Sequence, residues 1–430
     1  MPGPAADSAN PIPPAPADAR TLWLVLLAAF LGWMFDGLEM GIFPLVARPA
    51  LTEFFQHTTS DAKILEGQIG HWMSYVTALF LVGAACGGMI FGWLGDRIGR
   101  VRAMSLSILT YSIFTGLCYF AKEPWHLGAL RFVAALGMGG EWSLGVALVM
   151  ECWPRDKRPL LAGVIGAAAN LGFVLIAVVG LRFKITQDSW RWVMVAGAAP
   201  AALTFLIQVF VPESERWKES VKKSGLSRPF AEIFSPALAK TTLLAIAFAS
   251  IALIGTWGSV QWLPLWADQM THGKIPTAKA STQIFSGLGA VTGCLVGGWF
   301  AGRVNRRPAF FGLCFLSLLV CGILFRTISE YGDVFLFLVF LVGCFTAAFY
   351  GWFPLYFSEL FPTRVRATGQ GVSYNSGRIL AAGGALCQGQ LVAHYGGSYA
   401  QAGAVITLVY LIGMVLIWFA PETRDKALPD

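Results

Sequence analysis

Long segments without a charged residue most constrain what this 430-residue chain can fold into. Residues 241–267 and 334–358 contain no Asp, Glu, Lys or Arg. Each segment exceeds the roughly 20 apolar residues that an α-helix needs to cross a bilayer. Apolar residues make up 56% of the chain and charged residues only 13%, and a soluble protein has no interior large enough for that much apolar surface. We therefore expect lipid to surround most of the chain.

Twelve predominantly apolar segments of about this length follow one another, several of them free of charge, and together they predict an all-α membrane protein with twelve transmembrane helices. The longest connection between them, 212–239, is polar and basic and divides the helices six plus six. The predicted helices lie at 22–47, 70–94, 103–121, 125–151, 159–181, 191–211, 240–267, 281–302, 308–326, 333–357, 368–393 and 398–420.

This division predicts two six-helix bundles, at 21–211 and 240–420, joined by a cytoplasmic linker at 212–239. Residues 1–20 contain six prolines and lack the basic and apolar regions of a signal peptide. We expect them to form a disordered cytosolic tail. A second short cytosolic tail is expected at 421–430.

Lys and Arg are distributed unevenly between the two sets of predicted loops. Both tails and the loops after the even-numbered helices hold 20 of the 31, the other loops hold nine, and the last two lie inside helices. Loops rich in Lys and Arg stay on the cytoplasmic side of a membrane. Both termini are therefore predicted to be cytoplasmic.

The two halves of the chain repeat each other at a nearly constant offset. Two parallel repeats that enclose a site near the bilayer midplane are typical of transporters that rock between two conformations. The matched residues are Gly83, Gly87, Gly92, Arg97 and Arg100 with Gly289, Gly293, Gly298, Arg303 and Arg306, and Glu151, Pro154, Arg158 and Gly163 with Glu359, Pro362, Arg366 and Gly371.

Residues 92–100, GWLGDRIGR, match the signature G-x-x-x-D-[RK]-x-G-[RK] of the major facilitator superfamily, which the chain resembles over 20–424. At the cytoplasmic edge, Asp96 can meet a helix N-terminus of the other half and latch one conformation. The second copy has Gly302 in place of the acid, so a weaker latch is expected there. The residues assigned to the latch are Gly92, Asp96, Arg97, Gly99 and Arg100, together with Glu151, Arg158, Glu359 and Arg366 at cytoplasmic helix ends.

Three segments, 36–39, 137–142 and 359–369, are similar to organic-anion:proton symporters of the aromatic-acid, sialic-acid and metabolite clades and to their sugar-porter relatives. The seventh predicted helix lacks the paired glutamines of sugar porters, and the fifth lacks the G-P-x-x-G-G signature of drug:proton antiporters. The resemblance implies proton-coupled uptake of a small organic anion, such as a monocarboxylate, an aromatic acid or a sialic-acid-like compound. The alternative is a sugar or other neutral-solute symporter of the same fold.

Four ionisable residues on the first and fourth predicted helices, Asp36, Glu39, Arg131 and Glu141, are candidates for proton coupling. Each costs about 2.5–3.5 kcal/mol to insert into a membrane, so such residues are usually functional. An arginine beside the acids would hold them ionised until substrate or a conformational change loosens the contact. The alternative is a static salt bridge that fixes helix packing. Glu141 is either a second proton site or a counter-charge.

Arg378, predicted near the midplane, is a candidate ligand for a substrate carboxylate because its guanidinium is planar and permanently charged. The alternative is that it neutralises Glu141 without contacting substrate. Asn170 and Asn375 either bind substrate as well or form hydrogen bonds between helices. Polar and aromatic residues that either line the same cavity or serve packing are Trp257, Gln261, Tyr350, Trp352, Tyr356 and Tyr374.

Other classes of function find no support in the sequence. The eight Cys and five His show no ligand spacing, so neither a metal site nor any other cofactor is expected. A nucleophile–base set and a phosphate loop are not apparent, which argues against an enzyme. The basic residues scatter over loops, which argues against nucleic acid. A receptor or channel does not explain the six-plus-six repeat.

The expected partners are a small-molecule substrate, protons and the lipid bilayer, and the expected functional unit is a monomer.

Overall fold

The structure is a computed structural model that describes residues 18–56, 62–183, 185–224, 228–272, 274–275, 277–424 and 426–429. Within these residues the regular elements are all helices, as the sequence predicts. Most of the predicted tail at 1–20 lies outside the described residues.

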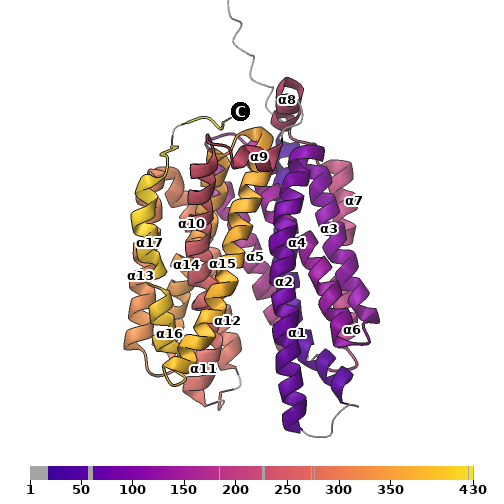
Figure 1. The fold of residues 1–430 in the computed structure, drawn as a ribbon, viewed down its shortest axis with the longest axis vertical. Coiled ribbons are helices and arrows are strands. Elements are labelled where there is room, and N and C mark those ends of the chain that lie inside the picture. The colour runs from indigo at the N-terminus through magenta and orange to yellow at the C-terminus, as the bar shows by residue number, and fades with distance from the viewer. Residues whose placement is uncertain are drawn as a thin grey trace, which may run out of the picture.

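The first half of the chain forms one helical bundle, drawn from indigo to magenta in Figure 1. Glycine-rich apolar stretches let its long helices pack closely. Its helices are α1 (Ala19–Phe55), α2 (Ala62–Ile98), α3 (Arg100–Leu117, continued by a 3₁₀ turn at Cys118–Phe120), α4 (Pro124–Cys152), α5 (Arg158–Arg182), α6 (Trp190–Ala196) and α7 (Ala201–Phe210).

Two short helices, α8 (Glu215–Ser224) and α9 (Pro229–Ile233), lie at one end of the molecule, which we call the linker end (Figure 1). The second half of the chain forms the other bundle. Its helices are α10 (Ala239–Gly258), α11 (Leu263–Thr271), α12 (Ala278–Arg303), α13 (Arg306–Thr327), α14 (Asp333–Leu360), α15 (Arg366–His394), α16 (Tyr399–Ile406) and α17 (Val409–Leu416), with 3₁₀ turns at Val260–Trp262, Thr363–Val365 and Ile417–Phe419.

Ten helical segments of the described chain are long and apolar enough to cross a membrane. The predicted helix at 191–211 is divided by a turn at 197–200 into α6 and α7, each too short to span alone. The predicted helix at 368–393 is present as α15, but polar residues such as Gln370, Asn375 and Arg378 lower its hydropathy. The all-helical membrane fold is therefore confirmed, while twelve crossings and cytoplasmic termini stay predictions.

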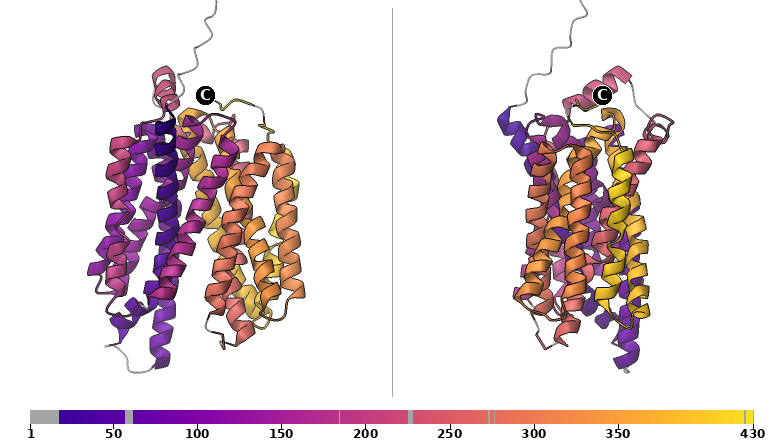
Figure 2. Two further views of the ribbon diagram at one scale, coloured as in Figure 1. Left: turned by 180° about the vertical axis from the view of Figure 1, so that it is seen from behind. Right: turned by 90° about the vertical axis from the view of Figure 1, so that its left-hand side faces the viewer.

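The two bundles meet along two pairs of helices, α5 with α12 and α2 with α15. Seen from behind, α5 and α12 lie side by side at the boundary between the bundles (Figure 2). Helices α2 and α15 approach so closely at one point that a Cβ on Gly371 would lie 2.4 Å from the Gly88 carbonyl oxygen. Glycine is required there because any side chain would force the bundles apart.

Candidate functional site

A carboxylate from one bundle caps a helix of the other at the linker end. Asp96, at the end of α2, accepts hydrogen bonds from the Thr368 backbone N–H at 2.8 Å and the Thr368 hydroxyl at 2.6 Å. It also accepts from the Ala367 N–H at 3.2 Å and pairs with Arg100 at 3.0 Å. The first N–H groups of a helix have no partner within the helix, and its dipole attracts an anion. Asp96 therefore holds the two bundles together at this end.

Glu151 forms a second link between the bundles. One of its carboxylate oxygens accepts from Arg100 and from Arg366, each at 2.9 Å, and all three side chains are fully buried. Arg100 lies in the first bundle and Arg366 begins α15 in the second. Arg100 also donates to the Thr363 carbonyl of the second bundle at 2.7 Å. One carboxylate thus pairs with two buried cations that belong to different bundles, and Asp96 supplies a second negative charge to Arg100.

In the repeat of this arrangement in the second half, the ion-pair and hydrogen-bond partners of Glu359 among the described residues all lie in its own bundle, although Arg158 of the first bundle is within electrostatic range. Glu359 pairs with Arg306 at 2.8 Å and accepts from the Thr423 hydroxyl at 2.6 Å. At Gly302, where the first copy has Asp96, a Cβ would lie 2.6 Å from the Pro159 ring. Proline has no N–H, so the start of α5 lacks one of the two backbone donors that α15 offers to Asp96.

The remaining residues assigned to the latch serve packing or local contacts. A Cβ on Gly92 would lie 2.7 Å from the Ala367 carbonyl oxygen, which keeps α2 close to α15. Gly99 has φ of 104°, in the left-handed region that favours glycine, between α2 and α3. Arg97 lies over the Trp93 ring at 5.0 Å, and Arg158 donates to the Trp153 carbonyl at 3.1 Å.

Two equivalent glutamates outside the membrane helices cap α3 and α13. Glu213 accepts from the Arg100 and Val101 N–H groups at 2.9 and 3.0 Å, and Glu422 accepts from the Arg306 N–H at 2.9 Å. Burial raises the pKa of Glu213. For the more exposed Glu422, hydrogen bonds from backbone N–H groups outweigh its partial burial and lower the pKa.

The predicted C-terminal tail also contacts the start of α15 at the linker end, because the Pro429 carbonyl accepts a hydrogen bond from Arg366 at 2.9 Å.

We expect Asp96→Asn to shift the protein toward a conformation that is open at the linker end. The amide keeps the size of the side chain but loses the charge that faces the α15 N-terminus and Arg100, an effect of about 1 kcal/mol or more. Spin labels on the two bundles would measure the change as a longer distance distribution. Asp156→Asn, which removes an exposed acid at the same end, is the control. An unchanged distribution in Asp96→Asn would contradict a latching role.

Inside the first bundle, Glu39 and Arg131 form a buried ion pair between α1 and α4. Glu39 also accepts from the Thr115 hydroxyl at 2.7 Å, and the Arg131 guanidinium lies over the Phe80 ring at 4.6 Å. Both charged side chains are about 99% buried. The two charges are matched to each other, although one Glu39 oxygen and the Arg131 Nε have no hydrogen-bond partner among the described residues.

Asp36 and Glu141 are different, because neither carboxyl group has a hydrogen-bond partner among the described residues although both are buried. Glu141 packs directly against α1, where a Cβ on Gly32 would lie 1.9 Å from its Oε1. Gly32 is one helical turn before Asp36, so the two acids are neighbours. The equally unpartnered Tyr111 hydroxyl belongs to the same group, within electrostatic range of both acids. Unpaired buried carboxylates are too costly to stay ionised, so this arrangement is suited to binding protons.

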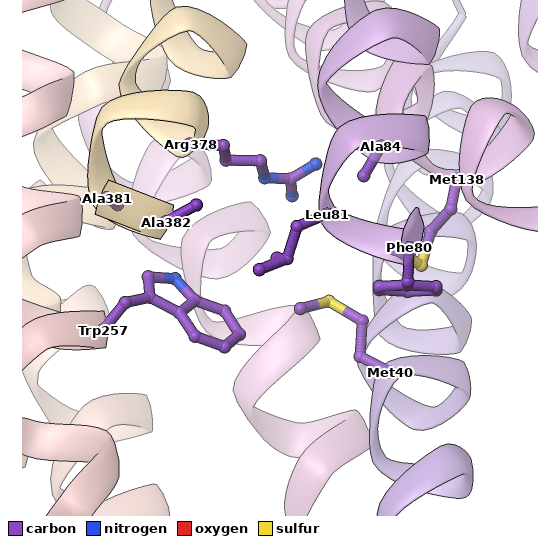
Figure 3. Close-up of a pocket in the computed structure, with 9 residues that line it drawn as sticks. All are labelled: Met40, Phe80, Leu81, Ala84, Met138, Trp257, Arg378, Ala381 and Ala382. Atoms are coloured by element: carbon purple, nitrogen blue, oxygen red, sulfur yellow. The ribbon is translucent and has the colours of Figure 1, made fainter. Parts of the chain in front are cut away.

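A cavity, which we call the central cavity, lies between the bundles beside these acids. Arg378 of α15 points from the second bundle toward α2 of the first, above Trp257 and Met40 (Figure 3). Six of the predicted substrate ligands line the cavity together: Arg378, Asn170, Gln261, Trp257, Tyr350 and Tyr374.

Arg378 is held in place but has no ion-pair partner among the described residues. It is 94% buried, donates to the Asn375 side-chain oxygen at 3.1 Å and lies over the Tyr374 ring at 5.0 Å. Trp142 of α4 stacks on the other bundle's Tyr374 with ring centres 4.4 Å apart. A guanidinium that lines a cavity without an ion-pair partner is suited to binding an anion.

Three other candidates do not line the central cavity. Asn375 is fully buried behind Arg378, which it positions, and packs against Gly88 of the other bundle. Trp352 lies in the core of the second bundle, 4.4 Å from the Tyr356 ring, because the apolar face of α14 packs inward. The Tyr356 hydroxyl donates to the Pro421 carbonyl at 2.8 Å.

The sequence analysis missed several lining residues. Trp33, Met40 and Phe173 all face the central cavity. They are apolar residues of membrane-spanning helices, where no sequence signal separates a cavity wall from a lipid-facing position. Among the described residues, no three His, Cys, Asp or Glu side chains gather as a metal site requires.

Comparisons with known proteins agree with this geometry. The profile of the Major Facilitator Superfamily matches residues 22–385. A putative metabolite transport protein of Haemophilus influenzae is 27% identical over 415 residues, which cover 94% of this chain and 98% of that one. A probable 4-methylmuconolactone transporter of Cupriavidus pinatubonensis is also 27% identical, over 97% of this chain and 93% of its own.

The fold also matches solved structures. The proton:xylose symporter XylE, bound to 6-bromo-6-deoxy-D-glucose, superimposes with a TM-score of 0.75 at 18% identity, over 95% of this chain and 98% of that one. At this identity the likeness shows the fold alone. The match to the family profile covers far more than half of the sequence. The chain is therefore a multi-pass membrane transporter of the major facilitator superfamily.

Proposed function

We propose that the chain takes up a small organic anion together with protons by alternating access between its two bundles. The observation that carries this proposal is the Arg378 guanidinium, buried in the central cavity between the bundles with no acid in ion-pair distance among the described residues. A carboxylate is the ligand that its charge and shape fit best. The name of the 4-methylmuconolactone transporter supports an organic acid.

Proton coupling is supported by the unpartnered acids beside the cavity. Asp36 lies within electrostatic range of both Glu141 and Arg378. A substrate carboxylate that pairs with Arg378 competes with these acids for its positive charge. Substrate binding then favours the protonated acids, and substrate release favours the ionised ones. Competition for the Arg378 guanidinium would thus link substrate binding to proton binding.

The second candidate is a neutral solute such as a sugar, favoured by the fold shared with the xylose symporter. In that case Arg378 would only balance the charge of Asp36 or Glu141. The amide side chains of Asn170 and Gln261 in the central cavity would suit hydroxyl groups as well as a carboxylate.

Replacing Arg378 by Lys tests the organic-anion proposal. Lysine keeps the charge but loses the planar guanidinium, which donates two parallel hydrogen bonds to a carboxylate. We therefore expect the affinity for a labelled aromatic monocarboxylate such as benzoate or nicotinate to fall about tenfold or more. Counterflow in proteoliposomes measures the affinity, and circular dichroism checks the fold.

The double variant Glu141→Gln/Arg378→Gln separates the two candidates, because it removes both charges together. If the substrate is an anion, the double variant binds it no better than Arg378→Lys does. Normal counterflow of labelled xylose in the wild type and in the double variant would contradict the organic-anion proposal and support a neutral-solute symporter.

A further inference from the structure

We infer that the substrate is a flat acid with one carboxylate at one end and an uncharged hydrogen-bonding group at the other. This inference rests on the proposed function, because it takes Arg378 as the carboxylate ligand. It goes further by stating the charge and shape of the molecule that the central cavity selects.

Among the described residues, the walls of the central cavity contain one cationic side chain and no second one. The central cavity adjoins a further cavity, and the walls of the two share five residues: Asn170, Phe173, Thr256, Gln261 and Tyr350. Arg378 is the only charged residue among the described residues that line either of them. The other arginine buried at this depth, Arg131, is already paired with Glu39. A second carboxylate on the substrate would therefore lose its hydration without gaining a counter-charge.

The end of the site away from Arg378 is polar but uncharged. Gln261 lines both cavities, and Gln283 lines the further one. No hydrogen bond from either amide to a described residue is present, so both are free to serve a ligand. An amide donates and accepts, which suits a carbonyl, hydroxyl, amide or ring nitrogen and does not favour an anion.

The walls between the two ends are aromatic and come from both bundles. Trp33 and Phe173 belong to the first bundle, and Trp257, Tyr350 and Tyr374 belong to the second. The Tyr350 hydroxyl is already bonded to Thr256 at 3.2 Å, so its ring is fixed. Aromatic side chains pack best against a flat conjugated body, by offset stacking or edge contacts. A ring or diene between the two ends of the substrate meets this requirement.

A matched pair of probes tests the charge count. 4-Carbamoylbenzoate and benzene-1,4-dicarboxylate have the same shape, and they differ in whether the far end is a neutral amide or a carboxylate. We expect the monoanion to bind the purified full-length protein at least about tenfold more tightly than the dianion. The cyclohexane analogue of the monoanion should bind several-fold more weakly, since its body is not flat. Isothermal titration calorimetry at neutral pH gives the three affinities.

A charge introduced at the far end should reverse this preference. Gln261→Arg supplies the missing second cation, so we expect it to bind benzene-1,4-dicarboxylate more tightly than 4-carbamoylbenzoate. Gln261→Leu, in which the new side chain has similar size and no charge, is the control. It should lower the affinity for 4-carbamoylbenzoate without favouring benzene-1,4-dicarboxylate. Circular dichroism and the elution volume in size-exclusion chromatography show whether both variants are folded.

The outcomes separate this inference from the proposed function. Equal or tighter binding of the dianion by the wild type, lost in Arg378→Lys, overturns the single-charge inference and leaves organic-anion transport intact. The single-charge inference is also overturned, with organic-anion transport intact, if Gln261→Arg still binds 4-carbamoylbenzoate more tightly than benzene-1,4-dicarboxylate. If none of the flat acids binds and xylose does, both the inference and the proposed function are wrong.

Discussion

Asp36→Asn is expected to abolish accumulation of substrate driven by a pH gradient while leaving substrate exchange measurable. Asp36 is buried without a hydrogen-bond partner among the described residues, so its replacement by a neutral amide of the same size leaves no charge unpaired. Exchange of substrate for substrate needs no net proton movement, whereas accumulation does. Glu141→Gln should have the same effect, because Glu141 lies beside Asp36 and is equally unpartnered.

Two further variants sharpen this test. Tyr111→Phe removes a hydroxyl from the same buried group without changing a carboxyl, so accumulation should persist. Glu39→Gln leaves Arg131 buried without its partner, which costs about 3–5 kcal/mol, so we expect loss of folded protein and of exchange together. Uptake and counterflow in proteoliposomes, with and without a pH difference, measure both activities. Full accumulation in both Asp36→Asn and Glu141→Gln would exclude these acids as the proton sites.

Glu151→Gln should open the linker end and reduce uptake strongly. The carboxylate is the shared partner of two fully buried arginines from different bundles, and its loss leaves uncompensated buried charge. Breaking a buried pair in this way costs about 3–5 kcal/mol, which corresponds to a change of more than a hundredfold in the balance between closed and open conformations. The arginines escape this cost by moving into water as the bundles separate.

Glu359→Gln is the matched control, because Glu359 is the pseudo-symmetric residue but pairs with Arg306 of its own bundle. It should lower stability without changing the conformation. Spin labels at the exposed positions Lys157 and Arg303, one in each bundle at the linker end, give the distance between the bundles. A similar distance change in both variants, or none in either, would contradict the assignment of Glu151 as the link between bundles.

The sequence predicts those parts of the site that depend on charge. A charged residue in an apolar segment needs a reason to be there, so Arg378 and the buried acids are visible without a structure. The internal repeat also predicts that Asp96 has no counterpart at Gly302, and the structure places Pro159 against that glycine. These features are encoded in residue type and spacing alone.

Other features depend on which way an apolar helix faces, and the sequence does not contain this information. Trp33 lines the central cavity and Trp352 packs inside a bundle, yet both are tryptophans in apolar runs. The sequence also does not show that Glu39 is paired with Arg131 while Glu141 packs against Gly32 without an ion pair, because both contacts depend on how α4 packs on α1.

The balance of buried charge determines which energy source can drive this transporter. Glu39 and Arg131 cancel each other, which leaves Arg378 within electrostatic range of Asp36, and Asp36 in turn within range of Glu141. With a monoanion on Arg378 and both acids protonated, the interior is neutral. With the substrate gone and one acid ionised, it is neutral again, and one proton has left with each anion. In the proposed cycle no net charge crosses the membrane, so the electrical potential, worth about 2.3 kcal/mol per charge at 100 mV, does no work on transport. Uptake would then follow the difference in pH alone, and it would persist in a depolarised cell as long as the outside stays acidic.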